Sequence, residues 1–279
     1  MMTDQYAVFG NPIKHSRSPQ IHRAFAEQTG QDINYVSALV ETSQFKPAAS
    51  RFFNNGGKGL NITVPFKQDA FTFADELSER ARRAGAVNTL IHQNDGKILG
   101  DNTDGVGLVR DISTNLGWAI AGRKVLLVGA GGAVMGVLEP LLQQHPALIV
   151  IANRTVSKAQ KLASDFADLG NIQGCGFDEL TDSGHFDLII NGSSASLAGE
   201  IAPLPTSVLT ASTQGYDMMY AAEPTPFMRW MNDHGAQQTA DGLGMLVEQA
   251  AEAFTLWRGV RPEATEVIQS MRKAMHGGQ

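Results

Sequence analysis

The chain has 279 residues, more than one domain usually holds, so its length predicts two compact units. A hydrophobic fraction of 43% and a charged fraction of 18% are ordinary for a globular protein. The net charge of -6 argues against nucleic acid as a partner, because a surface that follows phosphates needs a basic excess. The single cysteine, Cys175, excludes an internal disulfide, and no Cys/His spacing predicts a metal site.

The N-terminal segment predicts neither a leader nor a membrane anchor. The segment MMTDQYAVFG lacks a basic stretch followed by an apolar run. No segment approaches the roughly 18 apolar residues that a membrane span needs. We therefore expect a cytoplasmic protein that has no membrane partner.

In the first hundred residues, short β-rich runs alternate with amphipathic segments, the pattern of an α/β domain with a mainly parallel sheet. Ser18 is expected to cap a helix that has Pro19 at its first position and ends at Gly30. The predicted elements are strands 6–10, 33–40 and 59–64, helices 18–30, 43–55 and 68–83, and a hairpin of 85–91 with 97–103. We assign residues 1–103 to this first domain.

The next part of the chain has the pattern of a Rossmann-like nucleotide-binding domain. The continuously apolar strand KVLLVG runs directly into a glycine-rich turn. The predicted elements are helices 103–117, 133–145 and 156–169 and strands 124–129, 147–154, 186–192 and 212–219. We assign residues 104–239 to this domain. Two last helices, 243–258 and 262–275, have no place in such a unit, so we expect segment 240–279 to return to the first domain or to bridge the two.

The glycine-rich turn places small residues where a helix N-terminus can approach a pyrophosphate closely. It consists of Gly129, Ala130, Gly131, Gly132 and Ala133. Val134 follows where the strict GxGxxG pattern requires a small residue, so the turn is a variant of that pattern. A merely tight turn is the alternative interpretation, which the preceding strand and the following helix disfavour.

The end of the next strand favours NADP over NAD as cofactor. An NAD enzyme usually offers Asp or Glu there to the ribose 2′-hydroxyl, and this chain offers neither. Arg154 and Lys158 are cations that suit a 2′-phosphate. The whole segment is Asn153, Arg154, Thr155, Val156, Ser157 and Lys158. Solvated residues at a helix start are the alternative interpretation.

Lys67 is the candidate acid or base that a dehydrogenase needs when hydride is transferred. It follows Pro65 at the start of a predicted helix, where the helix dipole disfavours a cation. Stability alone would have favoured Asp or Glu there. An ordinary surface lysine is the alternative interpretation. His15 is a rival base without an evident carboxylate partner.

Short polar side chains at strand ends support Lys67. Asn61 and Thr63 lie two residues apart on one strand and hence on one face, and Asn88 ends another predicted strand. Asp104 could pair with Lys67 to transfer a proton, and it could also cap a helix. We expect these groups to converge on a small hydroxylated substrate.

Ser16 and Ser18 stand just before Pro19, where two hydroxyls and a helix N-terminus offer a site for a carboxylate. For Ser18 a simple capping role is the alternative. Together with the candidate proton-transfer group, these residues predict a substrate that is a hydroxylated carboxylic acid.

The order and spacing of eight segments resemble shikimate dehydrogenases of the AroE type over nearly the whole chain. The segments are GNPIKHSRSP, GLNITVPFK, GAVNT, GDNTDG, GAGGA, NRT, YDMMY and ADGLGMLVEQAA. The resemblance implies reversible NADPH-dependent reduction of 3-dehydroshikimate to shikimate, a step of aromatic amino-acid biosynthesis. It also implies a substrate domain at residues 1–103 and a monomer or homodimer.

The resemblance further implies residue roles, with Lys67 and Asp104 as the catalytic pair. The substrate-binding residues it implies are Ser16, Ser18, Asn61, Thr63, Asn88, Asp104, Tyr220 and Gln249. The cofactor-binding residues it implies are the turn Gly129 to Ala133, the segment Asn153 to Lys158, Met218, Gly242 and Glu79. For Glu79 the alternative interpretation is a solvated helix residue. The role of Gln249 implies that the last helices complete the substrate domain.

The chain departs from the family pattern at two positions. Met135 replaces an Arg that is often found there, and Ala195 replaces a common Gly. Neither position touches the proposed chemistry, although Ala195 could stiffen a loop beside the cofactor.

Two other functions stay open. One is a quinate/shikimate dehydrogenase that accepts NAD and a wider range of substrates, which the missing acidic residue disfavours. The other is a binding or regulatory protein that keeps the fold without catalysis, which the presence of both Lys67 and Asp104 disfavours.

Overall fold

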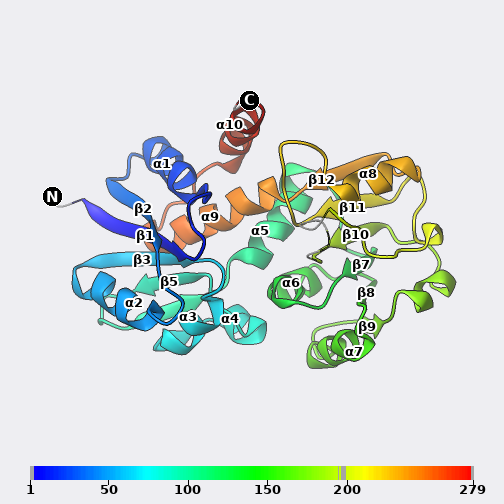
Figure 1. Ribbon diagram of the computed structural model, residues 1–279, viewed down its shortest axis with the longest axis horizontal. Helices are drawn as coiled ribbons and strands as arrows, with labels where there is room; N and C mark the ends of the chain where they lie inside the picture. Colours follow the sequence, from blue (N-terminus) through cyan, green and yellow to red (C-terminus); the bar gives the residue numbers. More distant parts are fainter. Residues whose placement is uncertain (1–2, 194, 196–198, 278–279) are drawn as a thin grey trace. The chain divides into compact units, whose positions relative to one another are not determined.

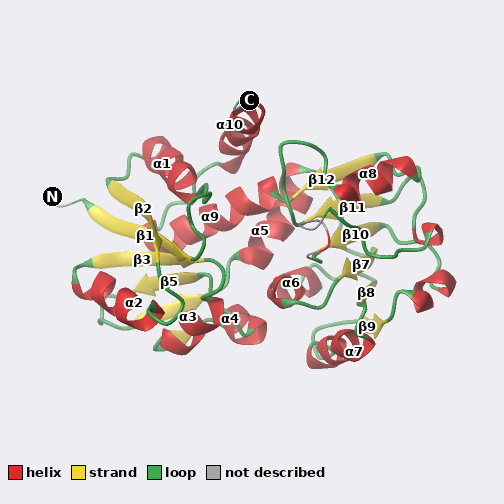
Figure 2. Ribbon diagram, in the orientation of Figure 1, coloured by secondary structure: helices red, strands yellow, loops and turns green. Residues whose placement is uncertain are grey.

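The computed structural model describes residues 3–193, 195 and 199–277 (Figure 1). Its contacts divide the chain into two compact units. The first unit comprises Met1–Gly107 and Val247–Gln269, and the second comprises Leu108–Leu246 and Ser270–Gln279. Each unit combines helices with one six-stranded sheet, which confirms the predicted fold class (Figure 2).

The sheet of the first unit has the strand order β2-β1-β3-β5-β6-β4. Its strands are β1 Asp4–Gly10, β2 Ile33–Leu39, β3 Gly57–Ile62, β4 Glu76–Leu77, β5 Thr89–His92 and β6 Ile98–Asp101. The pairs β1/β2, β1/β3 and β4/β6 are parallel, whereas β5 runs antiparallel to both β3 and β6. Strands β5 and β6 form the predicted hairpin. The start of β5 therefore lies at the same edge as the ends of β3 and β6.

The helices of the first unit include α1 Ser18–Thr29, α2 Phe45–Asn54, α3 Lys67–Phe73 and α4 Glu79–Ala84. Helix α1 ends at Gly30 in the left-handed conformation, φ 64°, as predicted. The predicted capping role of Ser18 is wrong. Arg17 occupies the N-cap position without a side-chain hydrogen bond, and Ser18 is already part of the helix.

The predicted helix 68–83 is also wrong, since α3 and α4 are separated by the short strand β4. Ala74 leaves α3 with extended backbone, ψ 139°. The Asp75 carboxylate accepts a hydrogen bond of 2.8 Å from the first amide of β6, and this contact holds the segment at the sheet. Ser78 then starts α4 by accepting a hydrogen bond from the amide of Ala81. Side chains that bind nearby backbone groups compete with a continuous helix.

The sheet of the second unit is parallel throughout and has the order β12-β11-β10-β7-β8-β9. Its strands are β7 Lys124–Val128, β8 Leu148–Ala152, β9 Ile172–Cys175, β10 Leu188–Asn191, β11 Gln214–Asp217 and β12 Gln238–Asp241. This is the strand order of the Rossmann fold, which reverses between β7 and β10. Ligands of such sheets bind beyond the carboxyl ends of the strands at that reversal.

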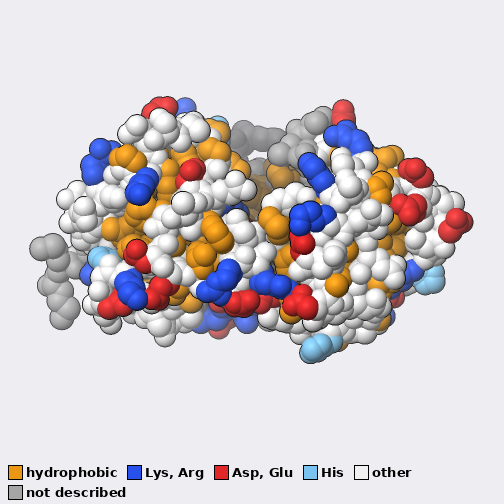
Figure 3. Space-filling view, turned by 90° about the horizontal axis from the view of Figure 1, so that it is seen from below, with side chains coloured by type: hydrophobic (Ala, Val, Ile, Leu, Met, Phe, Trp, Pro, Cys, Tyr) orange, Lys and Arg blue, Asp and Glu red, His pale blue; other side chains and the backbone are white. Residues whose placement is uncertain are grey.

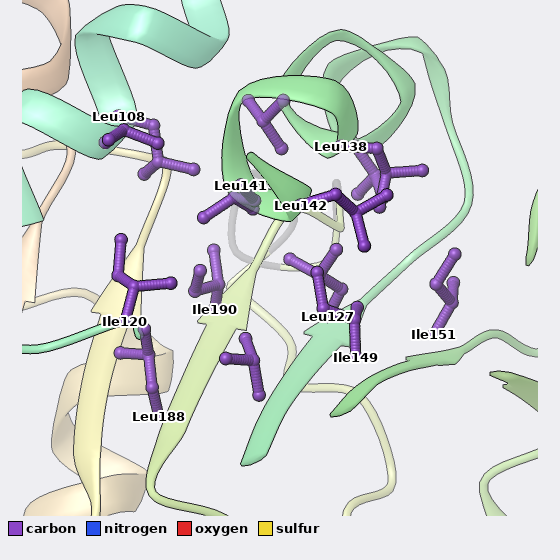
Figure 4. Packing of buried hydrophobic residues seen from close by; sticks show 14 of the residues in the cluster. Leu108, Ile120, Leu127, Leu138, Leu141, Leu142, Ile149, Ile151, Leu188 and Ile190 are labelled. Atoms are coloured by element: carbon purple, nitrogen blue, oxygen red, sulfur yellow. The ribbon is translucent and has the colours of Figure 1, made fainter. Parts of the chain in front are cut away.

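Buried aliphatic side chains fix the helices of the second unit to its sheet. The helices are α6 Gly132–Leu142, α7 Val156–Asp165 and α8 Pro226–Asp233. Figure 4 shows Leu138 and Leu141 of α6 packed with Leu127 of β7 and Ile190 of β10. This packing fixes the start of α6 immediately beyond the end of β7.

Three helices pass from one unit into the other along the chain. They are α5 Asp104–Arg110, α9 Leu243–Arg258 and α10 Ala264–His276. The predicted helix 103–117 corresponds to α5 followed by a π-helical turn at Asp111–Asn115. Within the described part of the chain, no helix is both long and apolar enough to span a bilayer.

Acidic and basic side chains lie close to one another on the face drawn in Figure 3. Exposed ion pairs occur in each unit, for example Lys97 with Glu76 at 2.5 Å and Lys161 with Asp165 at 2.8 Å. Such pairs stabilise a fold little, but they offset charge of one sign with charge of the other.

Candidate active site

A lysine and an aspartate are in direct contact at the edge of the first sheet where β3 and β6 end. Lys67 is the first residue of α3, and its Nζ donates to Oδ2 of Asp104 at 2.5 Å. Asp104 is the first residue of α5. The side chains of Lys67 and Asp104 are 33% and 16% exposed, so a substrate can still reach the ammonium group.

Asn88 connects this pair to the adjoining strand. Its Nδ2 donates to Oδ1 of Asp104 at 2.8 Å, so each carboxylate oxygen of Asp104 accepts one hydrogen bond. Asn88 precedes β5 and does not end a strand as predicted, but the antiparallel direction of β5 places it at the same edge. Oε1 of Gln249, in α9, lies 3.5 Å from Nδ2 of Asn88 and accepts from Thr103 Oγ1 at 3.3 Å.

Asn61 lies at the same edge and is almost fully buried, with 6% exposure. Its Oδ1 accepts a hydrogen bond of 2.7 Å from the Tyr35 hydroxyl and lies 3.1 Å from Nε2 of His22. Neither His22 nor Tyr35 was predicted from the sequence as a partner of Asn61. Burial lowers the pKa of His22 to about 3, although the hydrogen bond to Asn61 acts in the opposite direction, so the imidazole is neutral at ordinary pH.

The two predicted carboxylate-binding serines lie side by side at the start of α1. The amide of Ser18 donates to Oγ of Ser16 at 3.3 Å. Burial raises the pKa of Tyr35, and the nearby hydroxyl of Ser18 acts in the opposite direction. Thr63 follows β3 and is half-buried. The rival base His15 is exposed in the loop before α1.

A cleft of about 590 Å³ lies in the second unit beyond the carboxyl ends of β7, β8 and β10. Of the predicted cofactor residues, it is lined by Gly129, Ala130, Gly131, Gly132, Ala133, Asn153, Arg154, Thr155 and Lys158. Ala195, which was expected beside the cofactor, also lines the cleft. The remaining lining residues were not predicted and are Phe177, Gly192, Ser193, Glu200, Ile201, Ala202 and Pro203. Val156 and Ser157 start helix α7 and are not part of the lining.

The glycine-rich turn fits a dinucleotide. A Cβ atom added to Gly131 or Gly132 would meet no atom within 4 Å, so these glycines leave the space over the turn open. Gly129 has φ +106°, and a Cβ there would lie 3.2 Å from the amide of Ser193. Gly131 is the N-cap of α6 and makes no side-chain hydrogen bond to the first amides of the helix. These backbone N–H groups can therefore bind an anion.

The loop after β8 fits the extra phosphate of NADP. Arg154 and Lys158 are both exposed and line the cleft. Asn153 stands directly after the strand and donates to the carbonyl of Thr155 at 3.0 Å, which shapes the loop. Two cations suit a phosphate dianion.

The segment after β11 carries Met218 and Tyr220 and is bonded to the end of β12. The amide of Gly242 donates to the carbonyl of Met219 at 2.9 Å. A Cβ on Gly242 would lie 2.2 Å from the carbonyl oxygen of Met218, so the close approach requires glycine. The ligand roles of Met218, Tyr220 and Gly242 stay predictions.

Glu79 belongs to the first unit and is exposed at the start of α4. Its carboxylate forms an ion pair of 2.5 Å with Arg82, as a solvated helix residue would, and its cofactor role stays a prediction.

Met135 packs, half-buried, against the core of the second unit. Cys175 is buried, and burial raises the pKa of its thiol.

A Rossmann cleft with two cations beside it, in a chain that also pairs a lysine with a carboxylate, defines an NADP-dependent dehydrogenase. Three family models match the chain: the shikimate dehydrogenase substrate binding domain at residues 8–90, shikimate / quinate 5-dehydrogenase at 111–198, and the shikimate 5′-dehydrogenase C-terminal domain at 242–275. The chain belongs to the shikimate dehydrogenase family.

Individual relatives agree with this assignment. Shikimate dehydrogenase (NADP(+)) of Cellvibrio japonicus is 60% identical over 275 residues, which are 99% of each chain. The crystal structure of the Ael1 enzyme from Pseudomonas putida is 45% identical, with a TM-score of 0.92 over 96% of this chain and 97% of that one. Shikimate 5-dehydrogenase from Thermus thermophilus, solved with NADP(H) and shikimate, is 28% identical, with a TM-score of 0.85 over 97% and 99% of the two chains.

Proposed function

We infer that the chain is an NADP-dependent shikimate dehydrogenase, which reversibly reduces 3-dehydroshikimate to shikimate in aromatic amino-acid biosynthesis. The observation that carries this inference is the 2.5 Å contact between Lys67 and Asp104. It occurs in a chain that is 60% identical, over almost its whole length, to a shikimate dehydrogenase (NADP(+)). The identity supports the reaction, and the contact supports the residues that perform it.

Lys67 and Asp104 transfer the proton of the reaction. In the direction of reduction, Nζ of Lys67 gives a proton to the carbonyl oxygen that becomes the hydroxyl group. Asp104 holds the ammonium group in place through its Oδ2, and Asn88 fixes the other carboxylate oxygen. In the direction of oxidation, the neutral amine of Lys67 takes the proton back.

The polar residues around this pair orient the substrate. Ser16 and Ser18 bind the carboxylate through their hydroxyl groups, since both lie at the start of α1. Thr63, Gln249 and Tyr220 contact the ring substituents. Asn88 and Asp104 take part in both orientation and proton transfer.

The cleft of the second unit holds the cofactor. The turn Gly129 to Ala133 receives the pyrophosphate, and Arg154 and Lys158 bind the 2′-phosphate. When bound, NADPH supplies the hydride of the reaction. Met218 and Gly242 contribute to the nicotinamide half of the site, and Glu79 to the cofactor site as a whole. The first unit is thus the substrate unit and the second the cofactor unit.

The enzyme acts in the cytoplasm as a monomer or a homodimer. A single buried cysteine suits a reducing compartment. Light scattering after gel filtration distinguishes the two oligomeric states.

A matrix of initial rates tests the function. The purified chain is assayed with shikimate and with quinate, each with NADP and with NAD. We expect the highest kcat/KM with shikimate and NADP. Higher kcat/KM with quinate or with NAD would replace this function by that of a quinate/shikimate dehydrogenase, and no reduction of either cofactor would indicate a binding protein.

A further inference from the structure

We propose that Tyr35 is a positioning residue of the proton-transfer pair and acts through Asn61, so that Asn61 itself does not bind substrate. The proposal rests on the proposed function of Lys67 and Asp104. Its basis is a continuous series of buried hydrogen bonds inside the first unit. The series runs from Tyr35 through Asn61, Thr89 and Asn88 to Asp104.

The hydrogen bonds of Asn61 fix the orientation of its amide group. Its Nδ2 donates to the carbonyl of Asn88 at 3.4 Å and to Oγ1 of Thr89 at 3.2 Å. Its Oδ1 receives the hydroxyl of Tyr35 and the Nε2–H of His22. A carboxamide has two donor hydrogens and two acceptor lone pairs, and all four are used within the protein. Asn61 therefore has no hydrogen-bonding capacity left for a substrate hydroxyl.

His22 adds a second restraint on the same oxygen. It is fully buried, and its ring stacks on that of Tyr35 with 4.2 Å between centroids. Among the described residues, Nδ1 of His22 has no hydrogen-bond partner, so Nε2 carries the proton. The donor toward Asn61 is thereby fixed in one tautomer.

Beyond Asn61, each hydrogen bond orients the next one toward Asp104. Because Thr89 accepts from Asn61, its own hydroxyl hydrogen is free to donate to Oδ1 of Asn88 at 2.9 Å. Oδ1 of Asn88 also accepts from the backbone amide of Thr103 at 2.9 Å. With Oδ1 held by these two donors, the amide nitrogen of Asn88 faces Asp104 and donates to it at 2.8 Å. Thr89 is fully buried and Asn88 is 3% exposed, so water does not replace a missing link.

The test compares Tyr35→Phe with Tyr6→Phe, since each substitution removes one buried tyrosine hydroxyl from the first unit. The Tyr6 hydroxyl accepts from Arg258 at 3.3 Å and belongs to no link of the series. We expect Tyr35→Phe to lower kcat about fivefold to tenfold, the scale of one lost hydrogen bond, while the KM for shikimate stays within about twofold of that of the parent chain. Tyr6→Phe keeps kcat within about twofold of the parent chain, because loss of its single long hydrogen bond leaves the series intact. Equal kcat values for the two variants would overturn the proposal.

A double-mutant cycle with Thr89→Val separates a positioning role from a merely structural one. Valine keeps the shape of threonine but breaks the series between Asn61 and Asn88. If Tyr35 acts through this link, adding Tyr35→Phe to Thr89→Val lowers kcat no further, whereas independent effects would multiply and refute the proposal. Failure of the parent chain to oxidise shikimate with NADP would instead refute the proposed function, so the two failures are distinguishable.

Discussion

Lysine at position 67 is the first residue of helix α3, where a carboxylate would stabilise the helix better. Its contact with Asp104 supplies a reason for the cation. We expect Lys67→Ala to lower kcat by about two to four orders of magnitude, with a smaller effect on the KM for shikimate. Steady-state kinetics with saturating NADP measure both constants.

Lys97→Ala is the matched control for this substitution. Lys97 also forms an ion pair of 2.5 Å with a carboxylate of the first unit, but the pair is exposed. We expect its kcat to stay that of the parent chain. If Lys67→Ala kept its kcat and lost only affinity, Lys67 would be a substrate-binding residue and not the proton-transfer group.

Arg154 lines the cleft at the position where an NAD enzyme would carry a carboxylate. We expect Arg154→Ala to raise the KM for NADP about tenfold or more and to leave that for NAD nearly unchanged, since only NADP has the 2′-phosphate. Lys161→Ala, on helix α7 after this loop and paired with Asp165, is the control. Equal losses for NAD and NADP would contradict the assignment of Arg154.

His22 makes stability depend on pH. Its pKa is about 3 in the folded chain and about 6.5 in an unfolded one, so protons bind preferentially to the unfolded state between these values. The full stability is present above pH 6.5, and about 1.4 kcal/mol is lost for each pH unit below it. Between pH 6.5 and 5, urea unfolding should show a fall about 2 kcal/mol larger for the parent chain than for His22→Gln. Equal falls would show that His22 is not buried in its neutral form.

Residues with a local signal could be predicted from the sequence, and residues whose role depends on tertiary contact could not. Gly129 to Ala133 form a turn between a strand and a helix, and Lys67 follows a proline at a helix start, which are local patterns. His22 and Tyr35 instead meet Asn61 only because α1 packs on the sheet to which β2 and β3 both belong. Nothing in the neighbouring residues of either indicates this contact.

At the scale of elements, most strands of the second unit could be predicted because their apolar runs are continuous. The nucleotide-binding turn could be predicted because its glycines directly follow such a run. Each predicted strand of the second unit corresponds to an observed one, within a few residues at its ends. The interval 68–83 was mispredicted because Asp75 and Ser78 bind backbone amides of the sheet and of α4. Strands β9 and β12 were missed, since their sequences, IQGC and QTAD, contain no continuous apolar run.

Helix α10 reaches the end of β12 through Arg272. Its Nη1 donates to Oδ2 of Asp241 at 2.7 Å and to the carbonyl of Ala221 at 3.2 Å. Asp241 is 6% exposed, so the loss of this partner leaves a carboxylate that is poorly solvated. We expect Arg272→Met to lower the free energy of unfolding by about 2 kcal/mol, less than a fully buried pair would cost because Arg272 is partly exposed.

The same substitution tests whether α10 positions the loop that carries Tyr220. Since Ala221 directly follows Tyr220, loss of Arg272 should also raise the KM for shikimate severalfold. Urea unfolding and initial rates measure the two effects. Lys273→Met changes the exposed neighbouring residue and serves as the control. An unchanged free energy of unfolding would show that the contact with Asp241 contributes nothing.

At the scale of the whole molecule, the first unit depends on two distant stretches of chain. Arg80 links Asp101, at 2.6 Å, to Glu252 of α9, at 3.0 Å. Arg261 contacts Glu252 at 2.7 Å and Glu248 at 2.8 Å. These contacts tie α9, which carries Gln249, to the strand that leads into Asp104.

A chain that ends after Leu246 should therefore lose its activity with shikimate, because Arg80 loses Glu252 and the site loses Gln249. The truncation also removes fully buried side chains such as Phe254, and loss of a buried aromatic side chain costs about 3–5 kcal/mol, enough to unfold a marginal unit. Activity and near-UV circular dichroism measure the outcome, and a chain that ends after Gly277 is the control. Full activity of the shorter chain would show that residues 247–269 are dispensable.

The division of the chain has a consequence for the order of events on the ribosome. Residues 1–107 emerge early, yet the stretch 247–269 that completes their unit is translated almost last. Domains made from one continuous stretch can fold as soon as they leave the exit tunnel, N-terminal first. Here the nascent stretch 1–107 must wait, with its sheet incompletely covered, until synthesis has nearly finished.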